Sequence, residues 1–231
     1  MVVGNGLIGQ TFSNYKDDTD VLIFASGVSN SSTNELQEFE REKCLFLESI
    51  NTHGCKKTIY FSTCSIYDDS TSSSAYVKHK LEMETLVKKE CTDYIIFRVS
   101  NVVGNIGNPN TLINYFVNAI ANSDSIKVWK HAQRNIIDID DVKFIVDCKV
   151  KSDVKNRIVN VAVRKSEFVI DILYQVEHFL DKTSVSEITD KGSDLEIDTS
   201  DIHEELSIIE SKKGEGLEYI YSLLNKYYSL S

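Results

Sequence analysis

The chain has 231 residues, enough for one domain or for one domain with a small second region. Its composition is typical of a globular protein, with 42% hydrophobic and 26% charged residues. The formal net charge of −10 argues against nonspecific binding to nucleic acid or to an anionic membrane surface. A phosphate-bearing ligand must therefore be met by local donors, such as a helix N-terminus or a single arginine.

The five cysteines are scattered, odd in number and without Cys-x-x-Cys spacing. They indicate reduced thiols in a cytoplasmic protein rather than a disulfide or zinc framework. The N-terminus lacks the basic region and long apolar run of a signal peptide, and no 18-residue apolar span occurs. We therefore expect a cytoplasmic protein with no membrane partner, no nucleic-acid partner and no metal site.

The first residues predict a very short apolar strand, a glycine-rich turn and a short helix that reaches about Tyr15. The turn has the spacing Gly-x-Gly-x-x-Gly, with Gly4, Gly6 and Gly9. Such a turn brings backbone N–H groups and a helix N-terminus close to a pyrophosphate. The pattern alone is weak, because tight strand–helix turns are common. A strand before it and a helix after it favour dinucleotide binding.

The next connection is unusually short. A polar loop, Lys16 to Asp20, leads directly into a strand, Val21 to Phe24, and then into a small-residue turn, Ala25 to Ser31, with room for a ligand. A dinucleotide site normally has a second strand that ends in an acidic residue for the adenine ribose. No space exists here for a second and third strand, and the aspartates of the loop are expected to form a solvated turn.

A candidate acid/base pair follows the next strand. An apolar run that begins at Lys57 ends in the hydroxyl residues Ser62 and Thr63. Tyr76 and Lys80 stand four residues apart, on one face of the predicted helix. A neighbouring ammonium favours the phenolate, so this pair suits proton transfer at a carbonyl or carbinol. Taken alone, the spacing fits equally a packed tyrosine and a solvated lysine.

The remaining segments alternate between helix and strand. We expect helices at 33–51, 75–90, 112–121, 168–180 and 214–228, and strands at 94–99, 126–129 and 157–163. Asp140 or Asp141 is expected to cap a helix after an apolar stretch. Residues between the last two helices form a polar, acidic region with short elements. The alternation predicts an α/β fold with a parallel sheet.

Five motifs in this order resemble those of the extended short-chain dehydrogenases/reductases, in particular the NAD(P)-dependent sugar-nucleotide epimerase/dehydratase/reductase family. They are the glycine-rich turn, Phe24–Gly27, Ser62-Thr63 with Tyr76-x-x-x-Lys80, Phe97–Gly104 and Arg134–Val142. The resemblance implies a Rossmann-like doubly wound parallel sheet, shortened by two strands. It implies a dinucleotide-binding core over residues 1–164, with 105–135 on the substrate side, and a small C-terminal substrate-binding region over 165–231.

The resemblance also implies residue roles. Tyr76 would be the acid/base, Thr63 the catalytic hydroxyl, and Lys80 would bind the nicotinamide ribose and assist the tyrosine. The implied contacts to NAD or NADP are Gly4, Gly6, Leu7, Ile8, Gly9, Ala25, Ser26, Gly27, Ser62, Tyr76 and Lys80. The implied contacts to a sugar nucleotide are Thr63, Cys64, Ser65, Asn101 and Arg134. For Arg134 the alternative is a surface ion pair, and for Asn101 a role in shaping the turn.

Departures from the family pattern narrow the chemistry. The 4,6-dehydratases of the family carry Asp-Glu directly after the threonine, where this chain has Cys64-Ser65. The 3,5-epimerase/reductases use a cysteine two residues before the tyrosine that matches Tyr67, and Ser65 occupies that position here. The acidic residue for the adenine ribose is missing, which leaves NAD and NADP both open.

Three functions remain. The first is reduction of a keto sugar nucleotide, such as a 4-keto-6-deoxy sugar, in surface-polysaccharide synthesis. The second is 4-epimerisation with tightly held NAD. The third is a dinucleotide-binding regulatory module without turnover, which the presence of Thr63, Tyr76 and Lys80 disfavours. Family likeness also suggests a homodimer formed through the helices near 34–51 and 75–90.

Overall fold

The computed structural model describes residues 1–28, 33–53, 57–105 and 111–229. The chain packs into two compact units. The first comprises Met1–Val99 with Val142–Val161, and the second comprises Ser100–Asp141 with Ala162–Ser231. Residues 100–141 thus pack with the second unit. The expected division was a core over 1–164, with 105–135 on the substrate side, and a C-terminal region over 165–231. Among the described helices, none is long and apolar enough to cross a membrane.

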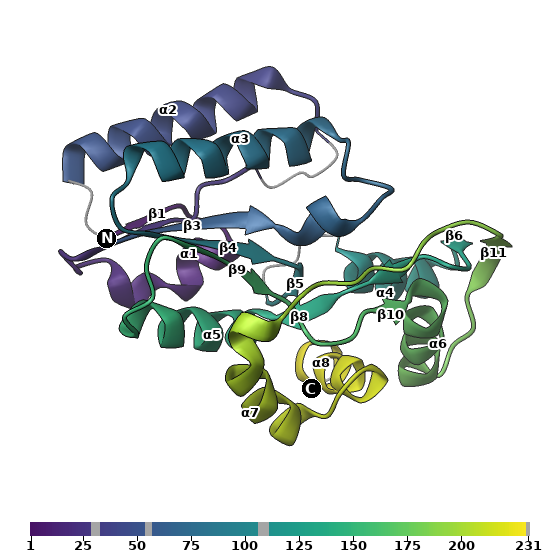
Figure 1. Ribbon diagram of the computed structural model, residues 1–231. Helices are drawn as coiled ribbons and strands as arrows, with labels where there is room; N and C mark the ends of the chain where they lie inside the picture. Colours follow the sequence, from purple (N-terminus) through teal and green to yellow (C-terminus); the bar gives the residue numbers. More distant parts are fainter. Residues whose placement is uncertain (29–32, 54–56, 106–110, 230–231) are drawn as a thin grey trace. The chain divides into compact units, whose positions relative to one another are not determined.

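A parallel sheet of five strands forms the centre of the first unit, in the order β1-β2-β3-β4-β9 (Figure 1). The strands are β1 (Val2–Val3), β2 (Val21–Phe24), β3 (Lys57–Thr63), β4 (Tyr94–Val99) and β9 (Arg157–Val161). The predicted α/β fold with a parallel sheet is confirmed. Since β1 is the edge strand of this order, the two strands expected to be missing are indeed absent from the described sheet.

Helices cover both faces of this sheet. The longest are α2 (Leu36–His53) and α3 (Ala75–Glu90), which lie together on one face (Figure 1). The short α1 (Leu7–Thr11) lies on the other face together with α5 (Ile139–Lys151). The predicted bounds of α3 are confirmed at both ends. Its start is fixed by Ser74, whose hydroxyl accepts a hydrogen bond from the backbone N–H of Val77 at 3.2 Å.

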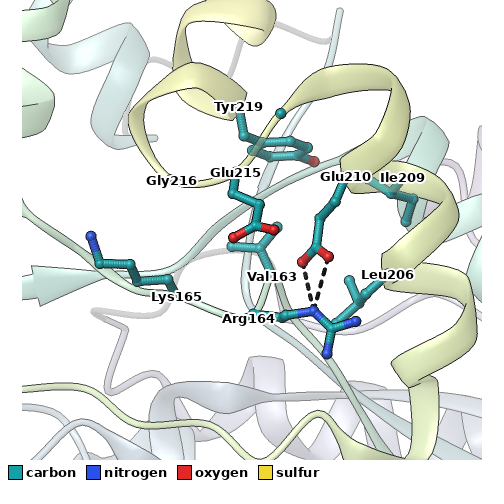
Figure 2. A pocket seen from close by; sticks show the side chains of 10 residues that line it. Val163, Arg164, Lys165, Leu206, Ile209, Glu210, Glu215, Gly216 and Tyr219 are labelled. Carbon is teal, nitrogen blue, oxygen red and sulfur yellow. Dashed lines mark hydrogen bonds and ion pairs between the residues drawn. The ribbon is translucent and has the colours of Figure 1, made fainter.

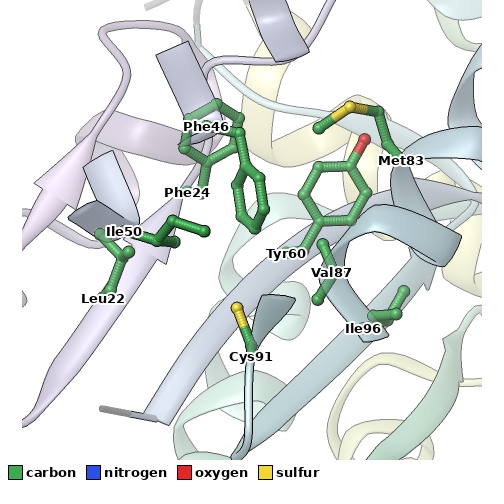
Figure 3. Close-up of a cluster of buried hydrophobic side chains, with 9 residues drawn as sticks. All are labelled: Leu22, Phe24, Phe46, Ile50, Tyr60, Met83, Val87, Cys91 and Ile96. Carbon is green, nitrogen blue, oxygen red and sulfur yellow. The ribbon is translucent and has the colours of Figure 1, made fainter. Parts of the chain in front are cut away.

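A hydrophobic cluster joins the sheet to α2 and α3 (Figure 3). Its buried members are Leu22, Phe24, Phe46, Ile50, Tyr60, Met83, Val87, Cys91 and Ile96. The rings of Phe24 and Phe46 meet edge to face with centroids 5.2 Å apart, a favoured aromatic geometry. Full burial of each large apolar side chain contributes about 1.5–3 kcal/mol, so this cluster fixes both helices on the sheet.

The connection from β1 to β2 differs in handedness from the connections from β2 to β3 and from β3 to β4. On β3, Tyr60 faces Phe46 of α2, while its neighbour Phe61 faces Phe12 beyond α1 at a centroid distance of 5.5 Å. Successive strand residues point to opposite faces, so α1 and α2 lie on opposite faces. Two connections that run in the same direction across a parallel sheet, but over opposite faces of it, have opposite handedness.

The second unit consists of short strand pairs and helices. Its elements are β5 (Asn101–Val103), α4 (Leu112–Asn122), β6 (Ser125–Trp129), β7 (Gln133–Arg134), β8 (Ile136–Asp138), β10 (Glu167–Phe168), α6 (Val169–Leu180), β11 (Val185–Thr189), η3 (Ser200–Ile202), α7 (His203–Lys213) and α8 (Leu217–Tyr228). Strand β5 pairs with β8, β6 with β11, and β7 with β10. The predicted helices in this unit are confirmed, whereas β11 and α7 were expected only as short elements of a polar region.

Asp138 organises the second unit. Its carboxylate accepts a hydrogen bond from the backbone N–H of Asp140 at 3.1 Å, so Asp138 caps α5 and the expected cap at Asp140 or Asp141 is wrong. The same carboxylate binds the ammonium groups of Lys213 at 2.8 Å and Lys226 at 2.7 Å. Burial raises the pKa of Asp138, but these bonds outweigh burial and lower it. One buried carboxylate therefore fastens α7 and α8 to the start of α5.

Candidate functional site

The glycine-rich turn packs directly against the end of β2. Gly4 has a φ of +131°, and a Cβ at this position would lie 2.4 Å from the carbonyl oxygen of Ala25. A Cβ at Gly9 would lie 2.3 Å from the carbonyl oxygen of Gly4. By contrast, a Cβ at Gly6 would meet nothing within 4 Å. The first and third glycines are thus required by the turn itself, and Gly6 leaves open space at the N-terminus of α1.

The other expected cofactor contacts near this turn are half-buried. Leu7 and Ile8 lie in the first turn of α1, and Ala25, Ser26 and Gly27 follow β2. The backbone N–H of Ala25 donates to the carbonyl oxygen of Val3 at 2.7 Å, which holds this segment beside the glycine-rich turn. The part of the small-residue turn at residues 29–31 lies outside the described residues.

At the end of β3, the hydroxyl of Thr63 caps a short helix, η2 (Cys64–Tyr67). It accepts from the backbone N–H of Ser65 at 3.0 Å and donates to the hydroxyl of Ser65 at 2.9 Å. The hydroxyl of Ser62 is buried and donates to Glu84 on α3 at 2.6 Å. Thr63 and Ser65 therefore form one hydroxyl pair, while Ser62 is directed toward a carboxylate inside the first unit.

The thiol of Cys64 faces the interior of the first unit. It is buried and donates to the backbone carbonyl oxygen of Arg98 at 3.1 Å. Burial raises the pKa of the thiol to about 12, which leaves it protonated and inert at neutral pH.

A buried ion pair next to Cys64 fixes the ends of three strands. The guanidinium of Arg98 on β4 binds Glu84 with two hydrogen bonds, of 2.8 Å and 2.7 Å. Arg98 also donates to the hydroxyl of Tyr67 at 3.1 Å, and Tyr67 donates to Asn160 on β9 at 3.0 Å. This fork geometry is the strongest form of an ion pair in proteins, and it holds η2 against the sheet.

Tyr76 and Lys80 do share one helix face. The ammonium of Lys80 lies 5.9 Å from the centroid of the Tyr76 ring, and the ring itself is half-buried. Lys80 is only 3% exposed, so the alternative of a solvated lysine is wrong. A Cβ at Gly27 would lie 2.6 Å from the Lys80 nitrogen. The ammonium therefore rests against the turn after β2, where α3, β3 and β2 meet.

The ammonium of Lys80 has three hydrogen-bond acceptors among the described residues. They are the carboxylate of Glu42 at 2.9 Å, the hydroxyl of Tyr60 at 3.1 Å and the backbone carbonyl oxygen of Phe61 at 3.3 Å. An ammonium has three N–H donors, and each has an acceptor here. Glu42 is fully buried, so the pair is a salt bridge inside the protein rather than on its surface.

Glu42 accepts four hydrogen bonds from the described residues. Besides Lys80, it receives the hydroxyl of Tyr60 at 2.7 Å and the backbone N–H of Val28 at 2.9 Å, and its second oxygen lies 3.0 Å from Nε2 of His79. Burial raises the pKa of Glu42, but the bond to His79, the charge of Lys80 and the bond from Tyr60 outweigh burial and lower it to about 2. Since an ionised carboxylate only accepts, His79 must carry its proton on Nε2.

Sequence reasoning missed Glu42, although a signal was present. Phe39, Glu42 and Phe46 stand three and four residues apart, so they share one face of α2. Phe39 and Phe46 are both buried, and Phe39 stacks on the ring of His79 at 4.5 Å. A charged residue on the apolar face of a helix requires a buried partner of opposite charge. That partner could have been sought among the lysines.

The two expected substrate residues of the second unit are bonded to backbone carbonyl groups. The side-chain amide of Asn101 donates to the carbonyl oxygen of Asn135 at 2.9 Å, which supports the β5–β8 pair. Arg134, half-buried on β7, donates to the carbonyl oxygen of Gln133 at 2.7 Å. This bond of Asn101 fits a role in shaping the local backbone, one of its two expected roles.

A small cavity in the second unit is lined by α7, α8 and the segment that follows β9 (Figure 2). The residues around it are Val163, Arg164, Lys165, Leu206, Ile209, Glu210, Gly214, Glu215, Gly216 and Tyr219. The cavity measures about 20 Å³, which is enough for a single water molecule. Arg164 is paired with Glu210 at 2.8 Å. The cavity is too small for a sugar or a nucleotide.

Comparison with known proteins supplies the family. The sequence profile of the NAD dependent epimerase/dehydratase family matches residues 4–162. No curated protein matches the sequence significantly. Many solved structures do match the fold. One is the dTDP-glucose 4,6-dehydratase of Bacillus anthracis in complex with NAD, with 15% identity and a TM-score of 0.69 over 97% of this chain and 79% of that chain.

Two further structures are similar to the same extent. The UDP-glucose 4-epimerase of Thermus thermophilus, in complex with NAD, has 12% identity and a TM-score of 0.68 over 98% of this chain and 83% of that chain. RMD of Pseudomonas aeruginosa, complexed with NADPH, has 14% identity and a TM-score of 0.69 over 98% of this chain and 88% of that chain. These likenesses establish the Rossmann-like fold. Since the family profile covers more than half of the 231 residues, the chain belongs to the NAD dependent epimerase/dehydratase family.

Proposed function

We propose that this protein is a NAD(P)-dependent reductase of a nucleotide-linked keto sugar, with a 4-keto-6-deoxy sugar as the first substrate class to test. The observation that carries the proposal is the placement of Lys80. Its ammonium lies 5.9 Å from the ring centroid of Tyr76 and directly against Gly27, where a Cβ would come within 2.6 Å. A proton donor and its lysine thus stand beside the turn that would line a dinucleotide.

The residues of the first unit fit a dinucleotide at two points. The turn at Gly4 and Gly9 allows no side chain, and Gly6 leaves open space at a helix N-terminus, which suits a pyrophosphate. Lys80 would bind the ribose next to the nicotinamide, which supplies or accepts a hydride when bound. On the adenine side, β1 is the edge of the sheet. That half of the ligand would therefore have fewer contacts.

Tyr76 and Thr63 would perform the proton chemistry. Tyr76 is half-buried and would give a proton to the substrate oxygen as the carbonyl is reduced. The hydroxyl of Thr63 donates to Ser65 at 2.9 Å and would turn from Ser65 to hold the same oxygen. Ser65 would become free to contact the sugar. Cys64 is not among the proposed substrate contacts, because its thiol is buried and donates a hydrogen bond to a backbone carbonyl oxygen.

The second unit would supply the substrate contacts expected from the family likeness. Arg134 would pair with the diphosphate of the sugar nucleotide, for which its fork of donors is suited. Its Nη1 donates to the carbonyl oxygen of Gln133 at 2.7 Å. Asn101 would act indirectly, through the backbone that it supports.

Two observations favour reduction over the other activities of the family. Dehydration needs an acid and a base after the threonine, and the chain has a buried thiol and a hydroxyl there, at Cys64 and Ser65. Epimerisation with retained cofactor needs tight binding, which the edge position of β1 disfavours. A 4-epimerase remains the second candidate, because the family includes such enzymes. A regulatory module without turnover is disfavoured by the assembled pair of Tyr76 and Lys80.

The test combines cofactor content with one substitution. The purified protein should release no NAD on denaturation and should bind NADPH or NADH reversibly, whereas a stoichiometric resident NAD would favour the epimerase. With a 4-keto-6-deoxy sugar nucleotide, Tyr76→Phe should lower kcat by at least about 100-fold, the lower range for a lost acid/base. Tyr174→Phe, at an exposed position on α6, is the matched control. An unchanged rate in Tyr76→Phe would refute the proposed chemistry.

A further inference from the structure

We propose that Glu42 is a positioning residue, whose carboxylate holds Lys80 and the turn after β2 in the arrangement that binds the nicotinamide half of the dinucleotide. This inference rests on the proposed function, since it assumes that Lys80 meets the ribose next to the nicotinamide. It concerns a residue of α2 that would itself contact neither cofactor nor substrate. Its effect would reach the ligand through Lys80 and through Val28.

The contacts of Glu42 join the segments that surround Lys80. One oxygen accepts from the hydroxyl of Tyr60 on β3 and from the ammonium of Lys80 on α3, at 2.7 Å and 2.9 Å. The other accepts from the backbone N–H of Val28 at 2.9 Å and lies 3.0 Å from His79. A carboxylate has about four lone-pair sites, and all are used here. Any other side chain at this position would leave at least one of these donors unsatisfied.

Lys80 needs such a partner to keep one conformation. Its side chain has four rotatable bonds, and ordering such a chain costs conformational entropy. An ammonium that is 3% exposed also requires a compensating charge. Glu42 supplies the compensating negative charge, and its hydrogen bond fixes the direction in which the Lys80 ammonium points. Without it, the ammonium would turn toward solvent, away from the ring of Tyr76.

The arrangement leaves one bond of Lys80 ready for exchange. The bond to the carbonyl oxygen of Phe61 is the longest of the three, at 3.3 Å, against 2.9 Å to Glu42 and 3.1 Å to Tyr60. Longer hydrogen bonds are weaker, so a ribose hydroxyl can replace Phe61 without breaking the ion pair. Glu42 thus anchors the ammonium while one N–H turns to the ligand.

A purely structural role would not require a charge at this place. Buried ion pairs add little net stability, and apolar residues of similar volume commonly replace them without loss. The neighbours of the carboxylate are also specific, because Lys80 belongs to the proposed cofactor site and Val28 directly follows Gly27, which belongs to it too. Glu42 is therefore explained better by the geometry that it imposes than by the stability that it adds.

The test compares a whole dinucleotide with a fragment that lacks the nicotinamide ribose. Glu42→Gln places an amide N–H opposite either Val28 N–H or the Lys80 ammonium, so one pair of donors must separate. Binding of NADPH or NADH, whichever the wild type binds more tightly, should weaken at least about tenfold by fluorescence titration. Binding of ADP, measured by calorimetry, should change less than about twofold, because ADP has no group for Lys80. Glu40→Gln, exposed on the same helix, is the matched control and should change neither.

A second variant distinguishes positioning from general loosening. In a Lys80→Met background, adding Glu42→Gln should weaken dinucleotide binding no further, since the residue through which Glu42 acts is gone. If Glu42→Gln does not fold, Glu42→Asp keeps the charge, withdraws the carboxylate and should show the same contrast between dinucleotide and ADP. Equal weakening of both ligands, no weakening of either, or full additivity with Lys80→Met would overturn the inference. A wild type that binds neither dinucleotide would instead overturn the proposed function.

Discussion

The buried carboxylate of Glu42 makes a measurable prediction about stability and pH. Its pKa falls from the ordinary 4.5 to about 2 in the folded protein. At 1.36 kcal/mol per pKa unit, this difference makes the folded state roughly 3 kcal/mol more stable at neutral pH than in acid well below pH 2. Because the folded pKa is the lower one, the contribution is present above pH 4.5 and is lost as the pH falls toward 2. Between pH 5 and about pH 3.5, the linkage relation gives a loss of about 1 kcal/mol.

Urea denaturation of the wild type and of Glu42→Gln, followed by circular dichroism, measures this loss directly. Other carboxylates titrate in both proteins, so their contributions cancel in the difference between the two free energies of unfolding. That difference should shrink by about 1 kcal/mol from pH 5 to about pH 3.5. For Glu40→Gln, at an exposed position, the free energy of unfolding should differ from that of the wild type by the same amount at every pH. A constant difference between wild type and Glu42→Gln would mean that folding does not lower the pKa of this carboxylate, and the electrostatic reasoning would be refuted.

Two further predictions concern Lys80 and the glycine turn. Lys80→Met leaves the buried carboxylate of Glu42 without its positively charged partner and should lower the free energy of unfolding, measured in urea, by about 3–5 kcal/mol. Adding Glu42→Gln to this variant should restore most of that loss. If it restores none, the buried ion pair is contradicted. Gly4→Ala forces a side chain into φ +131° and against Ala25 and should cost about 1–3 kcal/mol in thermal denaturation. In Gly6→Ala the new Cβ would have no atom within 4 Å, so the loss of stability should be less than about 0.5 kcal/mol. Equal losses for Gly4→Ala and Gly6→Ala would count against the described turn.

Much of the first unit could be predicted from the sequence, because local signals were strong. The run from Lys57 to Thr63 is apolar until its last hydroxyl residues, and it forms β3. The helix expected at 75–90 has the bounds of α3, and the structure shows that Ser74 caps its start. The helix period then placed Tyr76 and Lys80 on one face, and the structure confirms that they are neighbours.

The pairing of charges could not be predicted in the same way. Glu42 and Lys80 are 38 residues apart, and their contact depends on how α2 and α3 pack on the sheet. The same holds for Glu84 and Arg98, which lie on different elements. The cap of α5 was misplaced because three aspartates lie within four residues, and only the backbone geometry selects Asp138. Long-range packing decides these contacts, and one sequence does not reveal it.

The position of β1 has a consequence for protein engineering. Within the described residues, β1 pairs with β2 alone, so its other side offers backbone donors and acceptors to an added strand. The loop from Lys16 to Asp20 is the natural insertion point, since a strand–helix–strand graft there would extend the sheet without breaking an existing ladder. Such a chimera would add sheet strands on the side where the adenine of the dinucleotide would bind. If the proposed function holds, it should convert an exchangeable coenzyme into a resident one.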